Sequence, residues 1–167
     1  NQSIKPLRTE HDISLRWVLW GVLLFMIALY FLLAHVLWET HLTYNPHFVF
    51  MVIIATLLGV ILLGFMVAMI CGYFTGLIGS TNNPLSGIVI IVVLLFSLLY
   101  LSFFGLHGQA ATDHVASAVV LVSLVVATIG AISNENLQDL KAGQVVGATP
   151  WKQQIMLALG VVVSAFV

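Results

Sequence analysis

Apolar stretches of about 20 residues alternate with short polar stretches along the chain. An α-helix of about 20 apolar residues crosses the hydrocarbon core of a bilayer, which is roughly 30 Å thick. The stretches are apolar at odd and even positions alike, so they lack the alternation typical of a membrane β-barrel. The pattern therefore predicts an all-α, polytopic helical membrane protein with four complete transmembrane helices and a truncated fifth. The expected spans cover about residues 15–38, 48–76, 88–104, 115–132 and 152–167.

The two ends of the chain differ from these spans. Residues 1–14 form a polar arm with Lys5, Arg8, Glu10 and Asp12, so we expect this arm to lie in water or along the lipid headgroups. Residues 15–167 then form one membrane domain. The last apolar stretch stops at Val167, before it reaches the length that a complete span requires. We therefore expect a fragment of a larger membrane protein, with the remainder of that protein as a partner.

The most polar segment of the membrane domain covers residues 133–154, between two apolar stretches. Gly143, Gly147 and the Thr149-Pro150 pair disfavour one uninterrupted helix, because glycine lowers helix propensity and proline restricts the residue before it. We expect a broken-helix or loop element at residues 133–151. It would consist of a short amphipathic helix from Asn134 to about Gly143, a turn, and a new helix that begins near Pro150.

A second polar segment, residues 80–87, is uncharged and rich in helix-breaking residues. Irregular backbone is not stable in contact with lipid, so this segment lies at a membrane surface, is buried in protein, or borders a cavity. It is either a simple turn between helices or a broken-helix element whose free amides and hydroxyls meet a substrate, as in many secondary transporters. In the preceding span, Gly72 and Gly76 form a small-xxx-small pair that permits close helix approach.

Positive charge falls on one side of the predicted topology. With four complete spans, residues 1–14, 80–87 and 133–154 share one side of the membrane, and all five Lys and Arg residues lie there. The positive-inside rule makes that side cytoplasmic. We therefore expect a multi-pass protein of the bacterial inner membrane, with residues 1–14 and 133–152 in the cytoplasm.

The histidines show the opposite distribution. All but His11 lie at the outer ends or in the outer loops, namely His35, His41, His47, His107 and His114. They form either an outer metal or proton site or a set of ordinary headgroup residues, and the lack of a pair with the spacing of a helical metal site favours the second. The interiors of the second, third and fourth spans contain no histidine that could ligate haem. We expect no bound metal and no cofactor.

Composition narrows the class of function further. Apolar residues make up 61% of the chain and charged residues 7%, and the net charge of -1 gives no reason to expect nucleic acid as a partner. The single cysteine, Cys71, excludes an intrachain disulfide. The sequence contains no phosphate-binding loop, no zinc-protease motif and no nucleophile–base pair, so we expect a protein that is not an enzyme. A transporter, a channel or a structural membrane subunit remains.

The polar segment after the fourth span contains a candidate site. On a helix that begins at Asn134, the side chains of Asn134, Gln138 and Lys141 share one face. Beside them, Glu135 and Asp139 are like charges four positions apart, which is mildly unfavourable unless Lys141, a proton or a ligand offsets them. The alternative is an ordinary solvated face of a cytoplasmic loop helix.

Both polar segments resemble motifs of the oligopeptide transporter family, which includes the yellow stripe-like metal-chelate transporters. The first motif is Gly-Leu-Ile-Gly-Ser-Thr-Asn-Asn-Pro-Leu-Ser-Gly at residues 76–87. The second is Leu-Gln-Asp-Leu-Lys-Ala-Gly-Gln-Val-Val-Gly-Ala-Thr-Pro-Trp-Lys-Gln-Gln at residues 137–154. Their order and separation match the family, as does Arg-Thr-Glu-His-Asp-Ile-Ser-Leu-Arg-Trp-Val-Leu at residues 8–19. Two positions depart from the pattern: Ala142 stands where threonine is expected, and Trp151 where a basic residue is frequent.

The resemblance implies a proton-coupled secondary transporter that moves small peptides or metal-chelate complexes across a lipid bilayer. It assigns substrate binding to Ser80, Asn82, Asn83, Pro84, Ser86 and Gln138, to which the shared helix face adds Asn134. Asp139 and Lys141 are expected to form a pair that gates the path or links it to protons, with Glu135 beside them.

Two other classes of protein stay open. A non-transporting membrane scaffold, or an interaction subunit of a larger complex, would use the same polar segment to dock a cytoplasmic partner. A simple channel would lack saturable, proton-driven flux. The sequence also leaves open whether the substrate is a peptide or a metal chelate, and whether the protein is a homo-oligomer.

Overall fold

The computed structural model describes residues 12–37, 45–104 and 109–166, and within these ranges every regular element is a helix. Helix α1 spans Leu15–Val36, α2 spans Pro46–Ile78, and a short 3₁₀ helix, η3, spans Ser80–Asn82. Helices α3, α4 and α5 span Leu85–Phe104, Gln109–Val145 and Pro150–Ser164. In the described ranges, α1 to α4 are long and apolar enough to cross a membrane, which confirms the predicted fold class.

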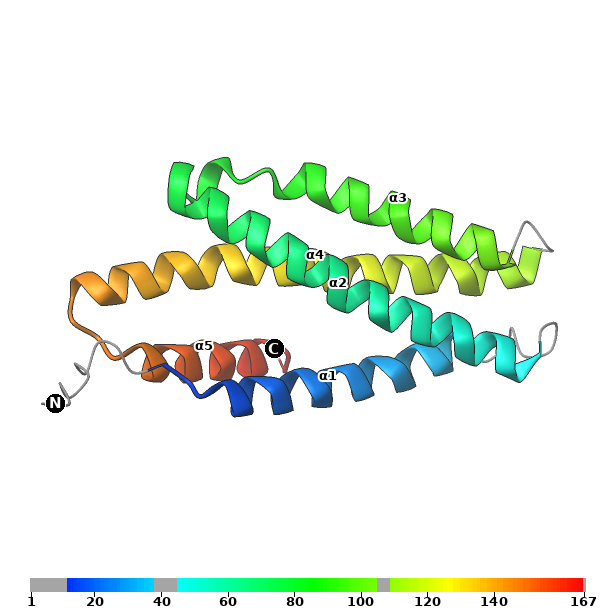
Figure 1. The fold of residues 1–167 in the computed structure, drawn as a ribbon, viewed down its shortest axis with the longest axis horizontal. Coiled ribbons are helices and arrows are strands. Elements are labelled where there is room, and N and C mark those ends of the chain that lie inside the picture. The colour runs from blue at the N-terminus through cyan, green and yellow to red at the C-terminus, as the bar shows by residue number, and fades with distance from the viewer. Residues whose placement is uncertain (1–11, 38–44, 105–108, 167) are drawn as a thin grey trace, which may run out of the picture.

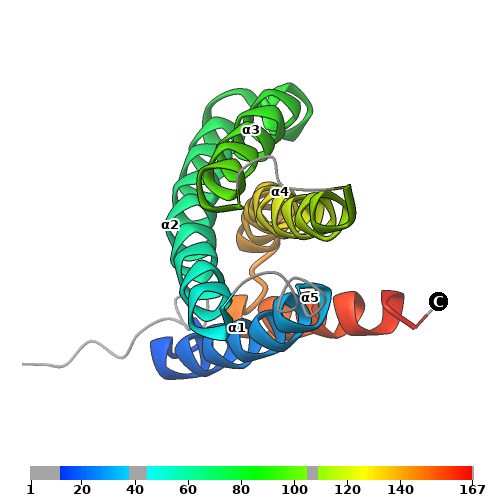
Figure 2. The ribbon, with the colours of Figure 1, turned by 90° about the vertical axis from the view of Figure 1, so that its right-hand side faces the viewer.

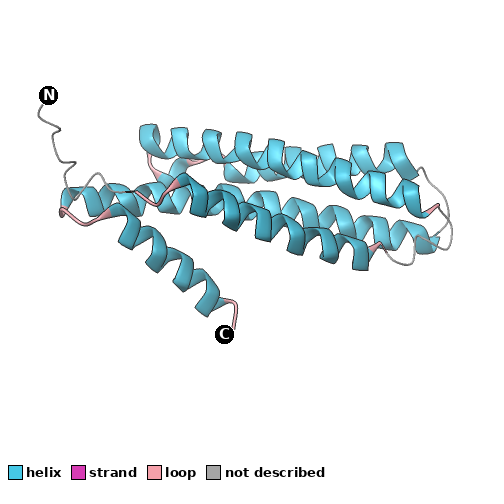
Figure 3. Ribbon diagram, turned by 60° about the horizontal axis from the view of Figure 1, so that its bottom comes forward, coloured by secondary structure: helices cyan, strands magenta, loops and turns pink. Residues whose placement is uncertain are grey.

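Helices α1 to α4 lie along the long axis of the molecule and reverse direction at each connection (Figure 1). Seen from one end, α4 lies inside the curve formed by α3, α2 and α1 (Figure 2). Helix α5 begins beside the start of α1, where the Ile13 amide donates to Gln154 Oε1 at 3.2 Å, and then points away from the bundle (Figure 3). The apolar core therefore lies chiefly among α2, α3 and α4, with Val60, Phe96 and Val122 buried between them.

Helices α2 and α4 approach each other closely because glycines lie between them. A Cβ atom built on Gly130 would lie 2.8 Å from Val67 Cγ1, and one built on Gly72 would lie 2.6 Å from Leu137 Cδ1. Both distances are shorter than van der Waals contact, so a larger residue at either position would push the helices apart. The predicted close approach is confirmed for Gly72, whereas a Cβ on Gly76 would meet nothing within 4 Å.

One buried polar contact ties α2 to α3 inside the apolar core. Thr56 Oγ1 lies 3.1 Å from the Tyr100 hydroxyl and 2.8 Å from the Val52 carbonyl oxygen. Both side chains are fully buried. Because a buried hydroxyl is costly unless it is hydrogen-bonded, this contact stabilises one register of α2 against α3.

The polar segment after the fourth span requires a correction. Residues 133–145 are not a separate amphipathic helix, because α4 continues through them to Val145. The break within the predicted 133–151 element is confined to residues 146–149, and α5 begins at Pro150 as predicted. A helix satisfies its own backbone hydrogen bonds in lipid and in water alike, so a change from apolar to polar side chains does not end it. Helices α3 and α4 also begin at Leu85 and Gln109, earlier than the expected 88 and 115.

The two ends of the bundle differ in their side chains. The start of α1, η3 and the turn from α4 to α5 lie at one end, and the connections from α1 to α2 and from α3 to α4 lie at the other (Figure 1). The described cations at the first end are Arg16, Lys141 and Lys152, and the described histidines at the second end are His35, His47 and His114. The remaining cations and histidines, and most of the arm at residues 1–14, lie outside the described residues.

Candidate functional site

The helix breaks between α2 and α3 for two local reasons. Gly79 has φ 83° and ψ 166°, a conformation that only glycine adopts readily. Pro84 disfavours a helical conformation for Asn83, which is extended with φ -68° and ψ 129°. Residues 80–87 thus connect two antiparallel helices, as the simpler of the two interpretations expects. The Asn83 side chain nevertheless reaches the polar end of α4.

Thr75, Asn83 and Asn134 form a group of polar side chains that we name the amide cluster. Asn83 Nδ2 lies 3.1 Å from Asn134 Oδ1, 3.3 Å from Thr75 Oγ1 and 3.0 Å from the Cys71 carbonyl oxygen. Thr75 Oγ1 also contacts Asn134 Oδ1, and it lies 2.7 Å from the Cys71 carbonyl oxygen. The amide cluster therefore joins three parts of the chain: the end of α2, the turn into α3, and α4.

Two further hydrogen bonds hold α4 at this place. Asn134 Nδ2 donates to the Ser80 carbonyl oxygen at 3.4 Å, and Ser133 Oγ donates to the Ala68 carbonyl oxygen at 2.9 Å. Asn83 Oδ1, by contrast, is buried and has no hydrogen-bond partner among the described residues. A buried polar atom without a partner costs about 1–3 kcal/mol, so this oxygen is a point that a water molecule or a substrate donor would stabilise.

The amide cluster contains two of the predicted substrate residues, Asn83 and Asn134. Ser80 adds its backbone carbonyl to the cluster and lines a neighbouring cavity. Three other predicted residues are exposed and lie outside the cluster: Asn82 and Pro84 at the break, and Ser86 in the first turn of α3.

Thr75 and Ser133 are not recognisable as site residues from the sequence pattern, because both lie at the end of an apolar stretch. For Thr75 the available signal is its position four residues before the helix break at Gly79. For Ser133 the available signal is that it directly precedes Asn134 in the sequence. In each case a hydroxyl stands where an apolar helix meets a polar segment.

A cavity of about 300 Å³ lies next to the amide cluster, and we name it the Lys141 cavity. Helix α4 presents Gln138 and Lys141 to this cavity, two of the side chains that helical spacing predicts on one face. The Lys141 Nζ atom donates to Gln144 Oε1 at 3.0 Å. The remaining residues that line the cavity are Thr75, Gly76, Gly79, Ser80 and Leu137.

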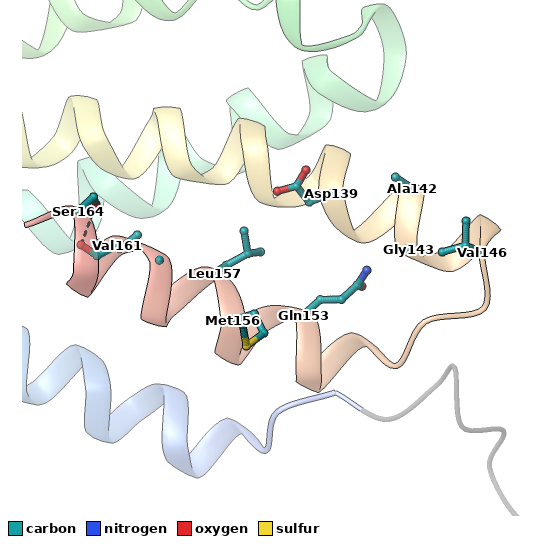
Figure 4. Close-up of a pocket in the computed structure, with 10 residues that line it drawn as sticks. Asp139, Ala142, Gly143, Val146, Gln153, Met156, Leu157, Val161 and Ser164 are labelled. Carbon is teal, nitrogen blue, oxygen red and sulfur yellow. Dashed lines mark hydrogen bonds between the residues drawn. The ribbon is translucent and has the colours of Figure 1, made fainter.

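A second cavity, of about 690 Å³, lies between the end of α4 and α5 (Figure 4). Asp139 faces it from α4, and Gln153 and Leu157 face it from α5. Gly143 leaves the space for Gln153, since a Cβ atom there would lie 1.6 Å from Gln153 Nε2. Asp139 and Lys141, both among the described residues, thus line different cavities instead of forming the pair that the sequence suggested. Glu135 is exposed on α4.

The turn that closes the second cavity is a helix C-cap. The Ala148 amide donates to the Gly143 carbonyl oxygen at 2.8 Å, and the Gly147 amide donates to the Gln144 carbonyl oxygen at 3.2 Å. With φ 73° at Gly147, these bonds form a Schellman motif, which ends a helix on a left-handed residue. Pro150 then begins α5. The turn thereby sets the direction in which α5 folds back past Asp139.

The histidines lie away from these cavities. His35, His47 and His114 are at the opposite end of the bundle, whereas His41 and His107 lie outside the described residues. In the part of the chain that the structure describes, no three His, Cys, Asp or Glu residues gather closely enough to hold a metal ion.

Comparison with known proteins shows the family to which the chain belongs. The family described as OPT oligopeptide transporter protein matches residues 2–167. A Haemophilus influenzae protein named "Putative oligopeptide transporter" is 41% identical over 123 residues, a match that covers 71% of this chain and 19% of the relative. The chain thus spans about a fifth of that relative's length. No solved structure matches the chain. The chain belongs to the OPT oligopeptide transporter family.

Proposed function

We propose that this chain is part of a proton-coupled secondary transporter that moves small peptides or metal-chelate complexes across a membrane. The observation that carries the proposal is the amide cluster beside the Lys141 cavity, at one end of an otherwise apolar helix bundle. Polar groups inside a membrane protein are energetically costly and typically face a pathway or one another. Family membership supports the same function.

The side chains around the helix break are the proposed substrate contacts. A hydrogen bond from Asn83 to Asn134 holds the helix break against α4. The buried Asn83 Oδ1 is available to a substrate donor. Ser80 and Gln138 line the cavity next to them. A substrate approaching this end would first meet the exposed side chains of Asn82 and Pro84 at the break and of Ser86 at the start of α3.

The charged side chains of α4 are the proposed coupling and gating residues. Glu135 and Asp139 are exposed carboxylates on the polar part of α4, so both are accessible from outside the bundle. Asp139 also faces α5 across the second cavity, so a change in its charge would alter the surroundings of α5. Lys141 lines the other cavity, and Asp139 does not. A substrate bound in that cavity would therefore contact Lys141 and not Asp139.

We also propose that the polar end of the bundle lies in the cytoplasm and that the membrane is the bacterial inner membrane. The described cations, Arg16, Lys141 and Lys152, gather at this end. The positive-inside rule relates such an excess of Lys and Arg to the cytoplasmic side.

Uptake by the full-length protein in proteoliposomes tests the function. With an imposed proton gradient, we expect accumulation of either a set of short peptides or a set of ferric chelates, and we expect a protonophore to abolish it. Equal accumulation with and without the gradient would contradict proton coupling. If folded protein accumulates neither set, the transporter assignment fails, and a membrane scaffold that docks a cytoplasmic partner becomes the better explanation.

A further inference from the structure

The Lys141 cavity has an unbalanced charge. Among the described residues that line it, Lys141 carries the one formal charge, and the others supply hydroxyl groups, an amide, backbone groups and one apolar side chain. The nearby carboxylate of Asp139 lines the other cavity. The recorded partner of Lys141 Nζ is the neutral Gln144 Oε1. Lys141 is exposed, and an ammonium group has three N–H donors, so this one neutral contact leaves donors that water or a bound anion can use.

The cavity also has room for part of a ligand. Gly76 and Gly79 line it, and a Cβ atom built on either glycine would meet nothing within 4 Å. Its volume of about 300 Å³ equals that of roughly ten water molecules at about 30 Å³ each. This space accommodates a charged group together with the neighbouring part of the molecule that carries it.

The chemistry of the lining favours an anion with oxygen acceptors. Ser80, with its hydroxyl group, and Gln138, with its amide, line the same cavity as Lys141. Hydrogen bonds between an ammonium group and a carboxylate are charge-assisted, and they are stronger than bonds between neutral groups. An ammonium group on the ligand would instead be repelled by Lys141. For a molecule with charges of both signs, the cavity therefore accepts the negative end.

We propose that the Lys141 cavity binds a carboxylate group of the transported molecule, with Lys141 as its counter-charge. The carboxylate is either the C-terminus of a short peptide or a carboxylate of a metal chelator, because both present the same charge and the same acceptor oxygens. The inference rests on the proposed function, and it specifies which group of the substrate enters which cavity.

The experiment compares matched probes in proteoliposomes that contain the full-length protein. One arm uses a tripeptide as its free acid and as its C-terminal amide. The other arm uses the ferric complexes of a carboxylate chelator and of a hydroxamate chelator. In the arm that contains the transported class, we expect the carboxylate form to be taken up about tenfold better, the effect of one charge-assisted hydrogen bond.

Variants test whether Lys141 is the residue that causes the preference for the carboxylate probe. Lys141→Gln should reduce the ratio of carboxylate-probe uptake to uptake of its uncharged or hydroxamate counterpart about tenfold, whereas Lys141→Arg should retain the preference. Lys152→Gln is the matched control, because it removes a positive charge from the same end of the molecule. Lys152 lies outside the cavity, with its Nζ atom 5.6 Å from the centroid of the Trp151 ring. The ratio of the two probes is measured on one preparation, so it does not depend on how much of a variant folds.

The outcomes separate the two proposals. Equal uptake of both members of a probe pair by the wild-type protein overturns the carboxylate inference and leaves transport standing. A preference that survives in Lys141→Gln also overturns it, since another residue then provides the counter-charge. Absence of uptake for all four probes overturns the proposed function and the inference together.

Discussion

Asn83 acts as a hydrogen-bond donor at the meeting point of three chain segments. Its side-chain nitrogen has three oxygen atoms within 3.3 Å, and its side-chain oxygen is buried with no partner among the described residues. An amide NH₂ group has two hydrogens, so the three acceptors share them. The neighbours favour this orientation of the amide, because the reverse orientation would bring its oxygen against the Cys71 carbonyl oxygen and Asn134 Oδ1, neither of which can donate. An asparagine is therefore required at position 83 because its side-chain NH₂ group donates these hydrogen bonds.

Replacement of this donor by an acceptor should destabilise the polar end. We expect Asn83→Asp to lower the free energy of unfolding by about 1–3 kcal/mol, because a carboxylate of the same shape cannot donate a hydrogen bond to the oxygen atoms that it would face. Chemical denaturation in detergent micelles measures this change. Asn82→Asp is the control, since Asn82 is exposed on the same turn and its change should stay within about 0.5 kcal/mol. Equal effects of the two variants would contradict the role of Asn83.

Asp139 is the residue at which proton coupling is best tested. If it couples transport to protons, Asp139→Asn should abolish the dependence of uptake on the proton gradient, because the amide cannot exchange a proton. Uptake is measured at several external pH values, with Asp113→Asn as the control. Asp113 is an exposed carboxylate on the same helix at the opposite end of the bundle. Wild-type pH dependence in Asp139→Asn would disprove the assignment.

Helices α2 and α4 depend on glycine for their packing. Gly130 of α4 faces Val67 and Cys71 of α2 and Leu85 of α3, and a Cβ atom there would lie 2.8–3.3 Å from these side chains. Small residues allow helices in a membrane to approach closely enough for van der Waals contact and interhelical hydrogen bonds. This approach also brings Thr75 of α2 within reach of Asn134 of α4. The amide cluster thus depends on packing deeper in the bundle.

A larger side chain at Gly130 should loosen this packing. We expect Gly130→Val to lower the free energy of unfolding by about 1–3 kcal/mol, the usual effect of overpacking a well-filled core. Gly21→Val is the matched control, because a Cβ atom on Gly21 in α1 would meet nothing within 4 Å. Chemical denaturation in detergent again measures both variants. A result in which Gly21→Val is the more damaging of the two would contradict the close approach of α2 and α4.

The bundle as a whole separates its polar chemistry from its histidines. Both cavities discussed above, the amide cluster and the described cations lie at the end where η3 meets α4 and where α5 begins. Helix α4 has 37 residues, about 55 Å at 1.5 Å per residue, which exceeds the roughly 30 Å of the hydrocarbon core. Its polar end therefore extends toward the membrane surface, where water and substrates have access.

Chemical labelling tests the placement of the two ends. In a cysteine-free background, an Asp113→Cys protein should react with a membrane-impermeant maleimide added to intact cells. A Gln144→Cys protein should react only after the membrane is opened, since Gln144 is exposed at the opposite end of α4. The reverse pattern would place the polar end outside the cell. Labelling of both proteins in intact cells would contradict a membrane-spanning α4.

Several elements follow directly from local sequence signals. The apolar stretches predict the four long helices, and the breaks near residues 80 and 147 follow from Gly79, Pro84, Gly147 and Pro150. The separate short helix expected from Asn134 to about Gly143 is wrong, because α4 continues through these residues, Gly143 included, to Val145. A glycine such as Gly143 lowers helix propensity without ending the helix, whereas Gly147 in a left-handed conformation and Pro150 after it mark the end of α4 and the start of α5.

The sequence by itself determined the helices, the positions of the breaks and the gathering of positive charge at one end, because hydropathy and backbone preference act within a few residues. Only the tertiary structure decided that Thr75 joins Asn83 and Asn134, and that Asp139 and Lys141 face different cavities. Those contacts depend on how α2 and α4 are rotated and how closely they pack. Rotation and distance between helices arise from the steric fit of many side chains across the bundle.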